Sequence, residues 1–337
     1  MKKKACFFVH TKDPTIVDRV EFYKMDVEIL RDLGFDVQFA FSYRRIPSDI
    51  DLYFVWWWTY AIFPVLRAKF SGKKTIITGT FNFHHHVTGA DYYSRPFYHR
   101  FLIRRSAQLV NANVMVSRFE YGRMLDEITS TNVFYSPHVL KVEKYLDKVR
   151  RDRQRYIFTV SWMNHSNAER KCIPEIIRAA RILKERDKPF EFIIAGKIEP
   201  DARYLLDLVE EMQVSDTVRF IGDIGEKEKI DRMSECGIYL QPTMFEGFGV
   251  AIAEALLCGA PTITSRLGGV PEVTGDHCSY VDGKKPEQIA GRIEEVFGDY
   301  GTHLELAMKG SAHIQEQFYY DRRRDDIAKI LKDLDVM

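Results

Sequence analysis

The first 140 residues alternate between short apolar runs and stretches in which apolar residues recur at helical spacing. The apolar runs, rich in β-branched and aromatic side chains, are ACFFVH, DVQFAFS, DLYFVWW, KTIITGT, NVMVS and NVFYSP. One helix is predicted over residues 17–33, with Gly34 as its C-terminal stop. Strands that are apolar throughout and alternate with helices predict a parallel sheet covered on both faces.

A charged run at residues 141–155 interrupts this pattern and is typical of a solvated linker or helix face. The alternation then begins again, with strands predicted at YIFTVS, FEFIIAG, VRFIGD and GIYLQPT. Helices are predicted over 173–184, near 202–212 and near 227–236, and a helix pair at the carboxyl end. We therefore predict two doubly wound, Rossmann-like α/β domains. Such sheets bind ligands at the carboxyl ends of their strands, so the expected site is a cleft between the two facing domains.

Length and composition agree with a two-domain globular protein and exclude some functions. A chain of 337 residues is too long for one ordinary core. Its 49 Lys and Arg nearly cancel 48 Asp and Glu, so bulk charge does not predict nucleic-acid binding. The five cysteines are scattered, and no pair has metal-ligand spacing. They predict buried thiols in a reducing cytosol, and hence a cytoplasmic protein.

One stretch, LYFVWWWTYAIFPVL at residues 52–66, resembles a membrane segment in its hydrophobicity. Fifteen helical residues cover only about 22 Å of a hydrocarbon layer roughly 30 Å thick, and Pro64 opposes a continuous span. The main interpretation is a buried strand that runs into a helix. The alternative is an interfacial contact of the tryptophans at 56–58 with lipid or a lipid-linked substrate, as a peripheral association. The same tryptophans could instead stack on an acceptor sugar.

The candidate chemistry lies in QPTMFEGFGVAIAEALLCG, residues 241–259. We predict a buried strand, the loop MFEGFG, and a helix over 250–258 that ends at Gly259. Gly247 and Gly249 would let the backbone approach a ligand, and the N–H groups of the helix start would face an anion such as a diphosphate.

The two glutamates of this stretch suit a ligand with hydroxyl groups at both ends. Glu254, one turn into the helix, would repel a phosphate but can accept hydrogen bonds from the hydroxyls of a ribose. Glu246, on the loop, would hold hydroxyls at the opposite end. The spacing therefore suits a nucleotide sugar. A dinucleotide site is disfavoured because Ile252 occupies the position where the Gly-x-Gly-x-x-Gly fingerprint needs a small residue.

At these residues the chain resembles a known family. EGFGVAIAEALLCGAPTITS resembles the Glu-x7-Glu signature of the retaining family-4 glycosyltransferases, which have the GT-B fold. TVSWMNHSNAERKCIPEIIRAARIL is similar to the strand, loop and helix that carry the family's basic diphosphate clamp. FEFIIAG, VRFIGDI and SRLGGVPEV follow in the family's order, while NANVMVSRFEYGRM and VFYSPHV resemble the end of its amino-terminal domain.

The resemblance implies the roles of individual residues. Glu246 would lie by the donor sugar, Glu254 would hold the ribose, and Lys171 with Arg170 would neutralise the diphosphate leaving group. The backbone groups facing sugar and phosphate would come from Gly247, Phe248, Gly249 and Val250. The implied reaction moves a sugar from a nucleotide-diphosphate sugar to an acceptor hydroxyl with retention of configuration, without cofactor or metal, in cell-surface glycan or polysaccharide synthesis.

The resemblance also implies a domain plan. Residues 1–145 would form the acceptor-side domain, 146–312 the donor-binding domain, and 313–337 a helix that crosses back to the first domain. The expected partners are the nucleotide sugar and a glycan, lipid-linked or small-molecule acceptor. No nucleic acid is expected.

Several features depart from the family pattern or leave alternatives open. Trp162 stands where the family has an arginine, and HTKDPT, after the first strand, lacks the usual glycines. In the run HHH, the resemblance implies that His84 or His85 contacts the donor sugar, because the family often has a histidine near this position. A metal site is disfavoured, because adjacent histidines do not readily share one metal ion. The alternative function is a catalytically silent GT-B scaffold or nucleotide-sugar-binding module. A nucleotide-sugar epimerase is disfavoured by the Glu-x7-Glu block.

Overall fold

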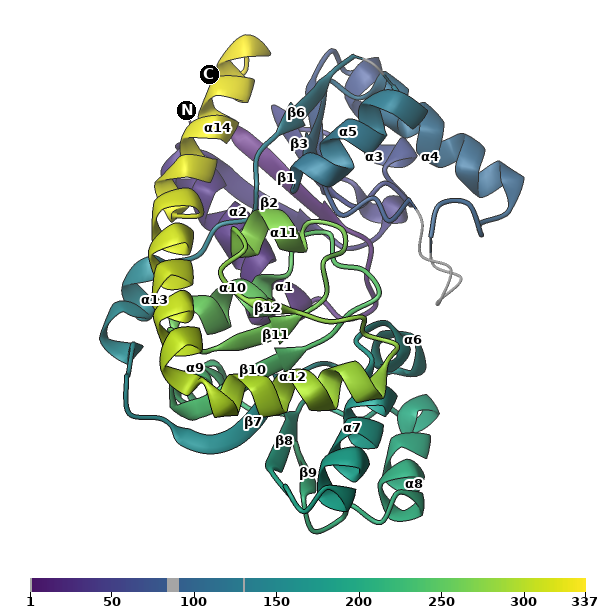
Figure 1. Cartoon of the computed structure of the whole chain (residues 1–337). Helices are drawn as coiled ribbons and strands as arrows, with labels where there is room; N and C mark the ends of the chain where they lie inside the picture. The colour runs from purple at the N-terminus through teal and green to yellow at the C-terminus, as the bar shows by residue number, and fades with distance from the viewer. Residues whose placement is uncertain (1, 84–90, 130) are drawn as a thin grey trace. The chain divides into compact units, whose positions relative to one another are not determined.

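A computed structural model describes residues 2–83, 91–129 and 131–337. The chain forms two units, each built around a six-stranded sheet whose paired strands are all parallel (Figure 1). The first unit comprises the described residues up to Leu140 together with Phe318–Met337, and the second comprises Lys141–Gln317. The predicted α/β class with two Rossmann-like domains is thus confirmed.

The sheet of the first unit has the strand order β2-β1-β3-β4-β5-β6. Its strands are β1 (Lys4–Val9), β2 (Asp36–Ala40), β3 (Leu52–Trp56), β4 (Lys74–Gly79), β5 (Ala112–Met115) and β6 (Val133–Tyr135). Its helices are α1 (Ile16–Arg19), α2 (Glu21–Asp32), α3 (Ile62–Phe70), α4 (Phe97–Leu109), α5 (Arg118–Glu127) and α14 (Tyr320–Asp333), with a 3-10 turn η1 (Tyr43–Arg45). Alternate residues of β1 enter two different cores: Phe7 packs with α2 and α14, and Phe8 packs with α3, α4 and α5.

The membrane-like stretch is a buried strand, β3, that leads into α3, as the main interpretation predicted. Trp56 and Trp58 are buried in the first unit, and the Trp58 indole donates a 2.8 Å hydrogen bond to Asn113. The Trp57 indole donates a 2.7 Å hydrogen bond to the Tyr23 hydroxyl. The interfacial alternative therefore fails for Trp56 and Trp58, whose rings are core. Among the described helices, none combines the length and the hydrophobicity needed to cross a membrane.

The helix predicted over residues 17–33 is interrupted. It consists of α1 and α2, separated by Val20, whose backbone is extended (φ −99°, ψ 117°). Apolar residues continue at helical spacing across the break, so the hydrophobic pattern does not reveal it.

The last helix, α14, packs against α2 in the first unit, where Figure 1 shows it in yellow beside the purple helix. Its Arg323 side chain is fully buried and pairs with Asp26 at 2.6 Å. Within the described residues the chain passes between the units after Leu140 and before Phe318, and the Leu140 N–H donates to the Phe318 carbonyl at 2.9 Å.

The sheet of the second unit has the order β12-β11-β10-β7-β8-β9. Its strands are β7 (Gln154–Val160), β8 (Glu191–Ala195), β9 (Val218–Gly222), β10 (Cys236–Gln241), β11 (Thr262–Thr264) and β12 (Ser279–Tyr280). Its helices are α6 (His165–Arg170), α7 (Ile173–Glu185), α8 (Tyr204–Glu211), α9 (Glu226–Glu235), α10 (Val250–Leu257), α11 (Val270–Thr274), α12 (Pro286–Gly298) and α13 (Tyr300–Gln317). Three 3-10 turns complete it: η2 (Val142–Lys144), η3 (Leu146–Lys148) and η4 (Pro200–Ala202).

One core of the second unit joins the sheet to α7, α8 and α12. The helices α9 and α10 contact β10 outside that core. All five cysteines are buried free thiols, as their scattered positions predicted.

Candidate functional site

The candidate site lies at the carboxyl ends of β7 and β10, which are neighbours in the second sheet. At this pair the strand order reverses, because β8 and β9 continue the chain on one side and β11 and β12 on the other. A reversal of this kind leaves a crevice beyond the strand ends, where doubly wound sheets bind ligands. Lys171 follows β7 on one side, and the loop with Glu246 follows β10 on the other.

Two side chains, Arg170 and Gln241, hold the Glu246 carboxylate in place. Arg170 Nη1 lies 2.8 Å from Glu246 Oε1, and Gln241 Nε2 donates to the same oxygen at 3.0 Å. Gln241 is itself oriented by the hydroxyl of buried Tyr239, which donates to it at 2.6 Å. Burial raises the pKa of Tyr239 well above its usual value, so this hydroxyl remains a donor at all ordinary pH values. The carboxylate is therefore held in one orientation by Arg170 and by a hydrogen-bonded chain from Tyr239 through Gln241.

The backbone at Glu246 is fixed by a second loop. The Gly269 N–H donates to the Glu246 carbonyl at 2.8 Å. Gly268 has a φ of +61°, and a Cβ at this position would lie 2.2 Å from the same carbonyl oxygen. Only glycine allows this approach, so the segment after β11 sets the position of Glu246.

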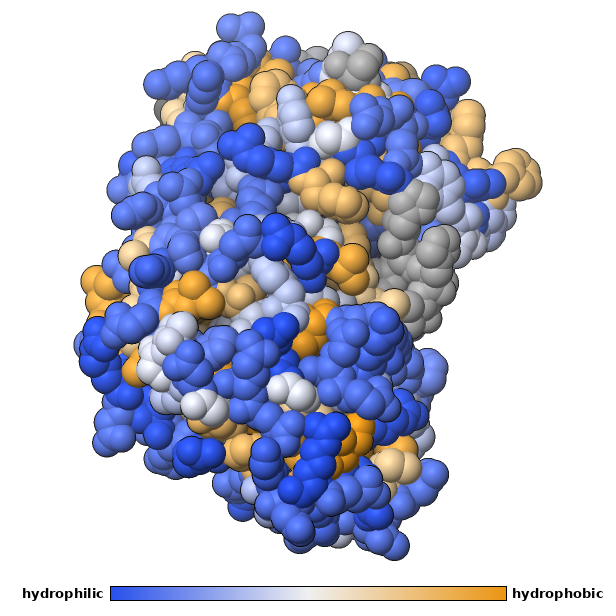
Figure 2. Space-filling view, viewed as in Figure 1, coloured by the Kyte–Doolittle hydropathy of each residue, from blue (hydrophilic) through white to orange (hydrophobic). Residues whose placement is uncertain are grey.

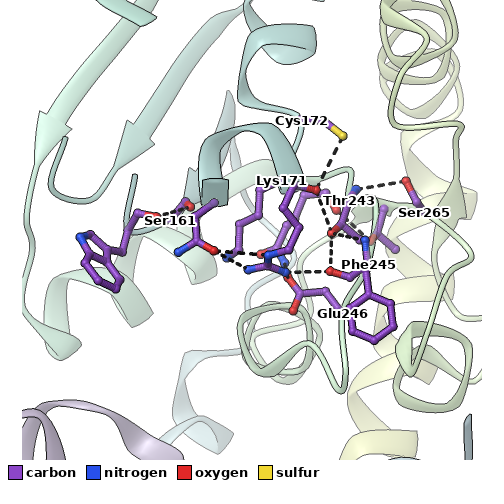
Figure 3. Close-up of polar contacts among 12 residues, drawn as sticks. Ser161, Lys171, Cys172, Thr243, Phe245, Glu246 and Ser265 are labelled. Carbon is purple, nitrogen blue, oxygen red and sulfur yellow. Dashed lines mark hydrogen bonds and ion pairs between the residues drawn. The ribbon is translucent and has the colours of Figure 1, made fainter. Parts of the chain in front are cut away.

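Arg170 joins the two loops of the site. Its Nη1 donates to the Phe245 carbonyl at 2.7 Å, and its own carbonyl accepts from the Met244 N–H at 2.7 Å. Thr243 reinforces the contact, because its Oγ1 lies 3.2 Å from the Arg170 carbonyl oxygen and 3.0 Å from the Phe245 carbonyl oxygen, and its O–H can donate to either. Figure 3 shows Lys171, Thr243, Phe245 and Glu246 gathered around these bonds. Arg170 thus positions the Glu246 loop.

Lys171 supplies a half-buried cation beside Glu246. It follows the short helix α6, whose start is capped by Asn164 through a 2.8 Å bond from the Asn167 N–H. The Lys171 ammonium donates to the Val160 carbonyl at the end of β7, at 3.4 Å. Burial lowers the pKa of Lys171 to about 8, while the Glu246 carboxylate acts in the opposite direction. At neutral pH the ammonium is mostly charged and weakly solvated, which suits an anionic ligand.

Glu254 lies in the first turns of α10 and is only 2% exposed. The Lys229 ammonium lies 2.6 Å from its Oε1, and the Tyr145 hydroxyl donates to that same oxygen at 3.0 Å. The helix begins after Gly249, whose φ of +96° turns the chain from the loop into the helix. The expected helix start is therefore present, and Glu254 is a buried, paired carboxylate.

The structure brings together Arg170, Lys171 and Glu246 and places Glu254 on the adjacent helix. The side chain of Phe248 is buried, so a ligand could meet only its backbone. Trp162 is exposed, and its indole donates to Glu199 at 3.0 Å. His84 and His85 lie outside the described residues, and the metal and sugar-contact interpretations of this run remain predictions.

Sequence reasoning missed four residues that shape the site. Lys229 and Tyr145 had no local signal, because one belongs to a charged surface helix and the other to the linker. Gln241 was visible as a polar residue at the end of an apolar strand. Gly268 lies in SRLGG, where a glycine pair after a strand indicates a close backbone approach.

Comparison with known proteins agrees with the geometry of the second unit. Residues 147–313 match the family model described as "Glycosyl transferases group 1". The matched segment contains both loops of the site and nearly the whole second unit. The second unit is therefore similar to the group 1 glycosyltransferase domain over almost its whole length.

Two curated relatives show the extent of the similarity. The phosphatidylinositol N-acetylglucosaminyltransferase gpi3 subunit of Schizosaccharomyces pombe is 32% identical over 112 residues, 33% of this chain and 24% of the relative. The N-acetyl-alpha-D-glucosaminyl L-malate synthase of Bacillus anthracis is 28% identical over 174 residues, 46% of this chain and 44% of the relative. The match thus spans less than half the length of either relative.

The fold of the entire chain has counterparts among solved structures. The crystal structure of Anabaena HepE in complex with UDP and glucose superposes with a TM-score of 0.77 at 13% identity, covering 98% of this chain and 100% of that one. At this identity the likeness concerns the fold, which is GT-B.

Proposed function

We propose that the protein is a retaining glycosyltransferase that moves a sugar from a nucleotide-diphosphate sugar to an acceptor hydroxyl. The observation that carries this proposal is the meeting of Lys171, Arg170 and Glu246 at the strand-order reversal of a group 1 domain, with Glu254 on the adjoining helix start. Such a donor has a diphosphate between two groups that carry hydroxyls, the sugar and the ribose. The Lys171 cation and the helix N-terminus suit the diphosphate, and the two glutamates suit the hydroxyls at either end.

Each residue has a distinct role in donor binding. The Lys171 ammonium neutralises the diphosphate, where negative charge grows as the leaving group departs. Glu246 accepts hydrogen bonds from sugar hydroxyls, and Arg170 keeps that carboxylate in place. Glu254 accepts from the ribose hydroxyls, with Lys229 compensating its buried charge. The backbone at Gly247, Phe248, Gly249 and Val250 lines the path between the two glutamates.

The proposed reaction needs no carboxylate nucleophile on the protein. The acceptor oxygen forms a bond to the anomeric carbon on the face from which the nucleoside diphosphate departs. The acceptor proton passes to a phosphate oxygen of the departing group. The donor's own phosphate thus serves as the base, and Glu246 acts by position and charge. Because Lys171 neutralises the diphosphate, the proposed reaction needs no metal ion.

The named relatives support a nucleotide-sugar donor and a glycan, lipid-linked or small-molecule acceptor. Anabaena HepE was crystallised with UDP and glucose, and the relatives carry the names of an N-acetylglucosaminyltransferase subunit and a glucosaminyl malate synthase. We propose a role of the same kind in glycan synthesis.

The deciding experiment incubates the protein with a panel of UDP-, GDP- and dTDP-sugars and follows donor cleavage by mass spectrometry. We expect one donor class to be cleaved in the presence of EDTA, and NMR of the product to show retained anomeric configuration. The Glu254→Ala variant should bind that donor more weakly by roughly 1–3 kcal/mol, the cost of lost hydrogen bonds to a charged group.

A catalytically silent nucleotide-sugar-binding module is the second candidate. It is favoured by Trp162, whose indole is bonded to Glu199 where the family has an arginine. A donor that raises the melting temperature without being cleaved, with or without acceptors, would support this candidate against the transferase.

A further inference from the structure

An aromatic and basic surface covers α3 and α4 in the first unit. These helices pack against each other, and Val65 and Ile103 face the core beneath them. On the outer side Phe70, Phe97 and Phe101 are 88%, 77% and 56% exposed. We call the exposed parts of the two helices the α3/α4 surface. In Figure 2, orange apolar side chains gather at the projecting end of α4, next to blue hydrophilic ones.

The charge of this surface departs sharply from that of the chain. The chain as a whole has a formal net charge of +1. Between residues 52 and 119 the sequence has nine Lys and Arg and a single carboxylate, Asp91, which is buried. Neither α3 nor α4 contains an acidic residue. Five of these cations lie on the two helices that expose the aromatic rings: Arg67, Lys69, Arg100, Arg104 and Arg105.

The cations of the α3/α4 surface are not compensated locally. Within the described residues, no ion pair involves Lys69, Arg104 or Arg105, all three of which are exposed. The Arg105 guanidinium lies 5.3 Å from the centroid of the Phe101 ring. Aromatic rings flanked by long cationic side chains form the arrangement that settles at the boundary between lipid headgroups and acyl chains.

We propose that the α3/α4 surface docks the protein on an anionic lipid bilayer. The rings of Phe70, Phe97 and Phe101 would enter the headgroup layer while Lys69, Arg104 and Arg105 contact anionic lipid headgroups. Charge complementarity selects this partner, because the negative surface of an anionic membrane attracts the basic side chains of the α3/α4 surface. Docking is separate from the proposed glycosyl transfer, which is assigned to residues of the second unit.

The test is co-sedimentation of the full-length protein with vesicles. One set contains phosphatidylcholine alone, and the other also contains about 30 mol% phosphatidylglycerol, an anionic lipid of the required charge. We expect binding to the anionic vesicles only, weakening as salt is raised, because screening acts on exposed charges. No nucleotide-sugar donor is added to either lipid set, so no glycosyl transfer takes place and the result does not depend on turnover.

Two variant pairs separate the two components of the surface. Arg104→Gln with Arg105→Gln should weaken binding about 25-fold, since each cation near an anionic surface contributes about fivefold. Phe97→Ser with Phe101→Ser should weaken binding at least tenfold while leaving some salt-sensitive attraction. The control, Leu206→Ser with Lys309→Glu, changes an exposed apolar and an exposed basic residue in the second unit and should bind like the wild type.

Melting temperature and vesicle-free donor cleavage should stay at wild-type values in all variants, since the changed side chains are exposed. The proposal is overturned if the wild type ignores anionic vesicles, binds neutral ones equally, or if both variant pairs bind undiminished. It is also overturned if the phenylalanine variants change only the oligomeric state in sedimentation velocity, which would make the surface an interface between copies.

Discussion

The charge of Lys171 is sensitive to pH just above neutrality, because burial lowers its pKa to about 8. Only the protonated ammonium neutralises a diphosphate. We therefore expect kcat/KM for the donor to fall about tenfold per pH unit above this pKa, since kcat/KM reports the free enzyme. Lys171→Arg keeps its charge throughout and should lack this alkaline limb, although the changed geometry will lower the rate itself.

The matched control for this pH profile is Lys184→Arg, a change on the surface of α7. It should keep the wild-type shape. An identical alkaline limb in Lys171→Arg would assign the titration to another group and remove Lys171 from the diphosphate site.

Glu120 is a second residue with a displaced titration, and it belongs to the first unit. It is fully buried and accepts the N–H groups of Phe81 and Asn82, both of which follow β4, at 3.0 and 3.2 Å. Burial raises its pKa to about 7, above the unfolded value near 4.5. Between these values the folded state binds more protons, so the contribution of Glu120 to stability falls as pH rises.

Glu120→Gln removes this titration. As the pH rises from 5 to 8, we expect the unfolding free energy of the wild type to fall relative to that of the variant. The shift should be at most about 3 kcal/mol, at about 1.4 kcal/mol per pKa unit. Calorimetry at the two pH values measures it, and a difference that does not change with pH would contradict the raised pKa.

At the scale of elements, the segment between β11 and α11 decides the geometry of the Glu246 loop. We expect Gly268→Ala to displace this loop, because its Cβ would lie 2.2 Å from the Glu246 carbonyl oxygen. Donor affinity and melting temperature should both fall. Gly222→Ala is the control: its φ of +74° is similarly strained, yet nothing lies within 4 Å of the added Cβ.

The comparison isolates the clash from the backbone strain. An alanine in the left-handed region costs roughly 1–2 kcal/mol in either position, so Gly222→Ala should lower stability by that amount and leave donor affinity unchanged. Equal donor affinity in the two variants would show that the Gly268 contact does not position Glu246.

Individual elements also show how much of the fold and of the candidate site the sequence predicts. Apolar runs predict the six strands of the first sheet and β7 to β10 of the second, but not the two-residue strand β12. The strand–loop–helix with Glu246 and Glu254 is where the pattern places it. The pattern does not predict the break at Val20, nor the partners of Glu254, because Lys229 and Tyr145 are brought to it by tertiary packing. Arg170 illustrates the same limit: its charge suggests a phosphate ligand, whereas its bonds fix the Glu246 loop.

At the scale of the whole molecule, the chain leaves the first unit after Leu140 and returns to it at Phe318. The returning helix α14 is held by Arg323, which is fully buried and bonded to Asp26, the Ser136 carbonyl and the Thr78 hydroxyl. Removing one member of a buried ion pair leaves the other charge uncompensated, and this costs about 3–5 kcal/mol. The first unit therefore depends on the last twenty residues for part of its core.

Arg323→Met should consequently lower the stability of the first unit by about 3–5 kcal/mol. In calorimetry of the full chain, the transition of the first unit should shift down while that of the second unit stays in place, because every partner of Arg323 belongs to the first unit. Pairing it with Asp26→Leu should restore much of the loss, since an apolar pair carries no buried charge. Arg324→Met, which breaks only solvent-screened pairs with Asp321 and Asp325, should leave both transitions close to those of the wild type. If Arg323→Met moved both transitions equally, α14 would stabilise the chain as one cooperative body instead of the first unit alone.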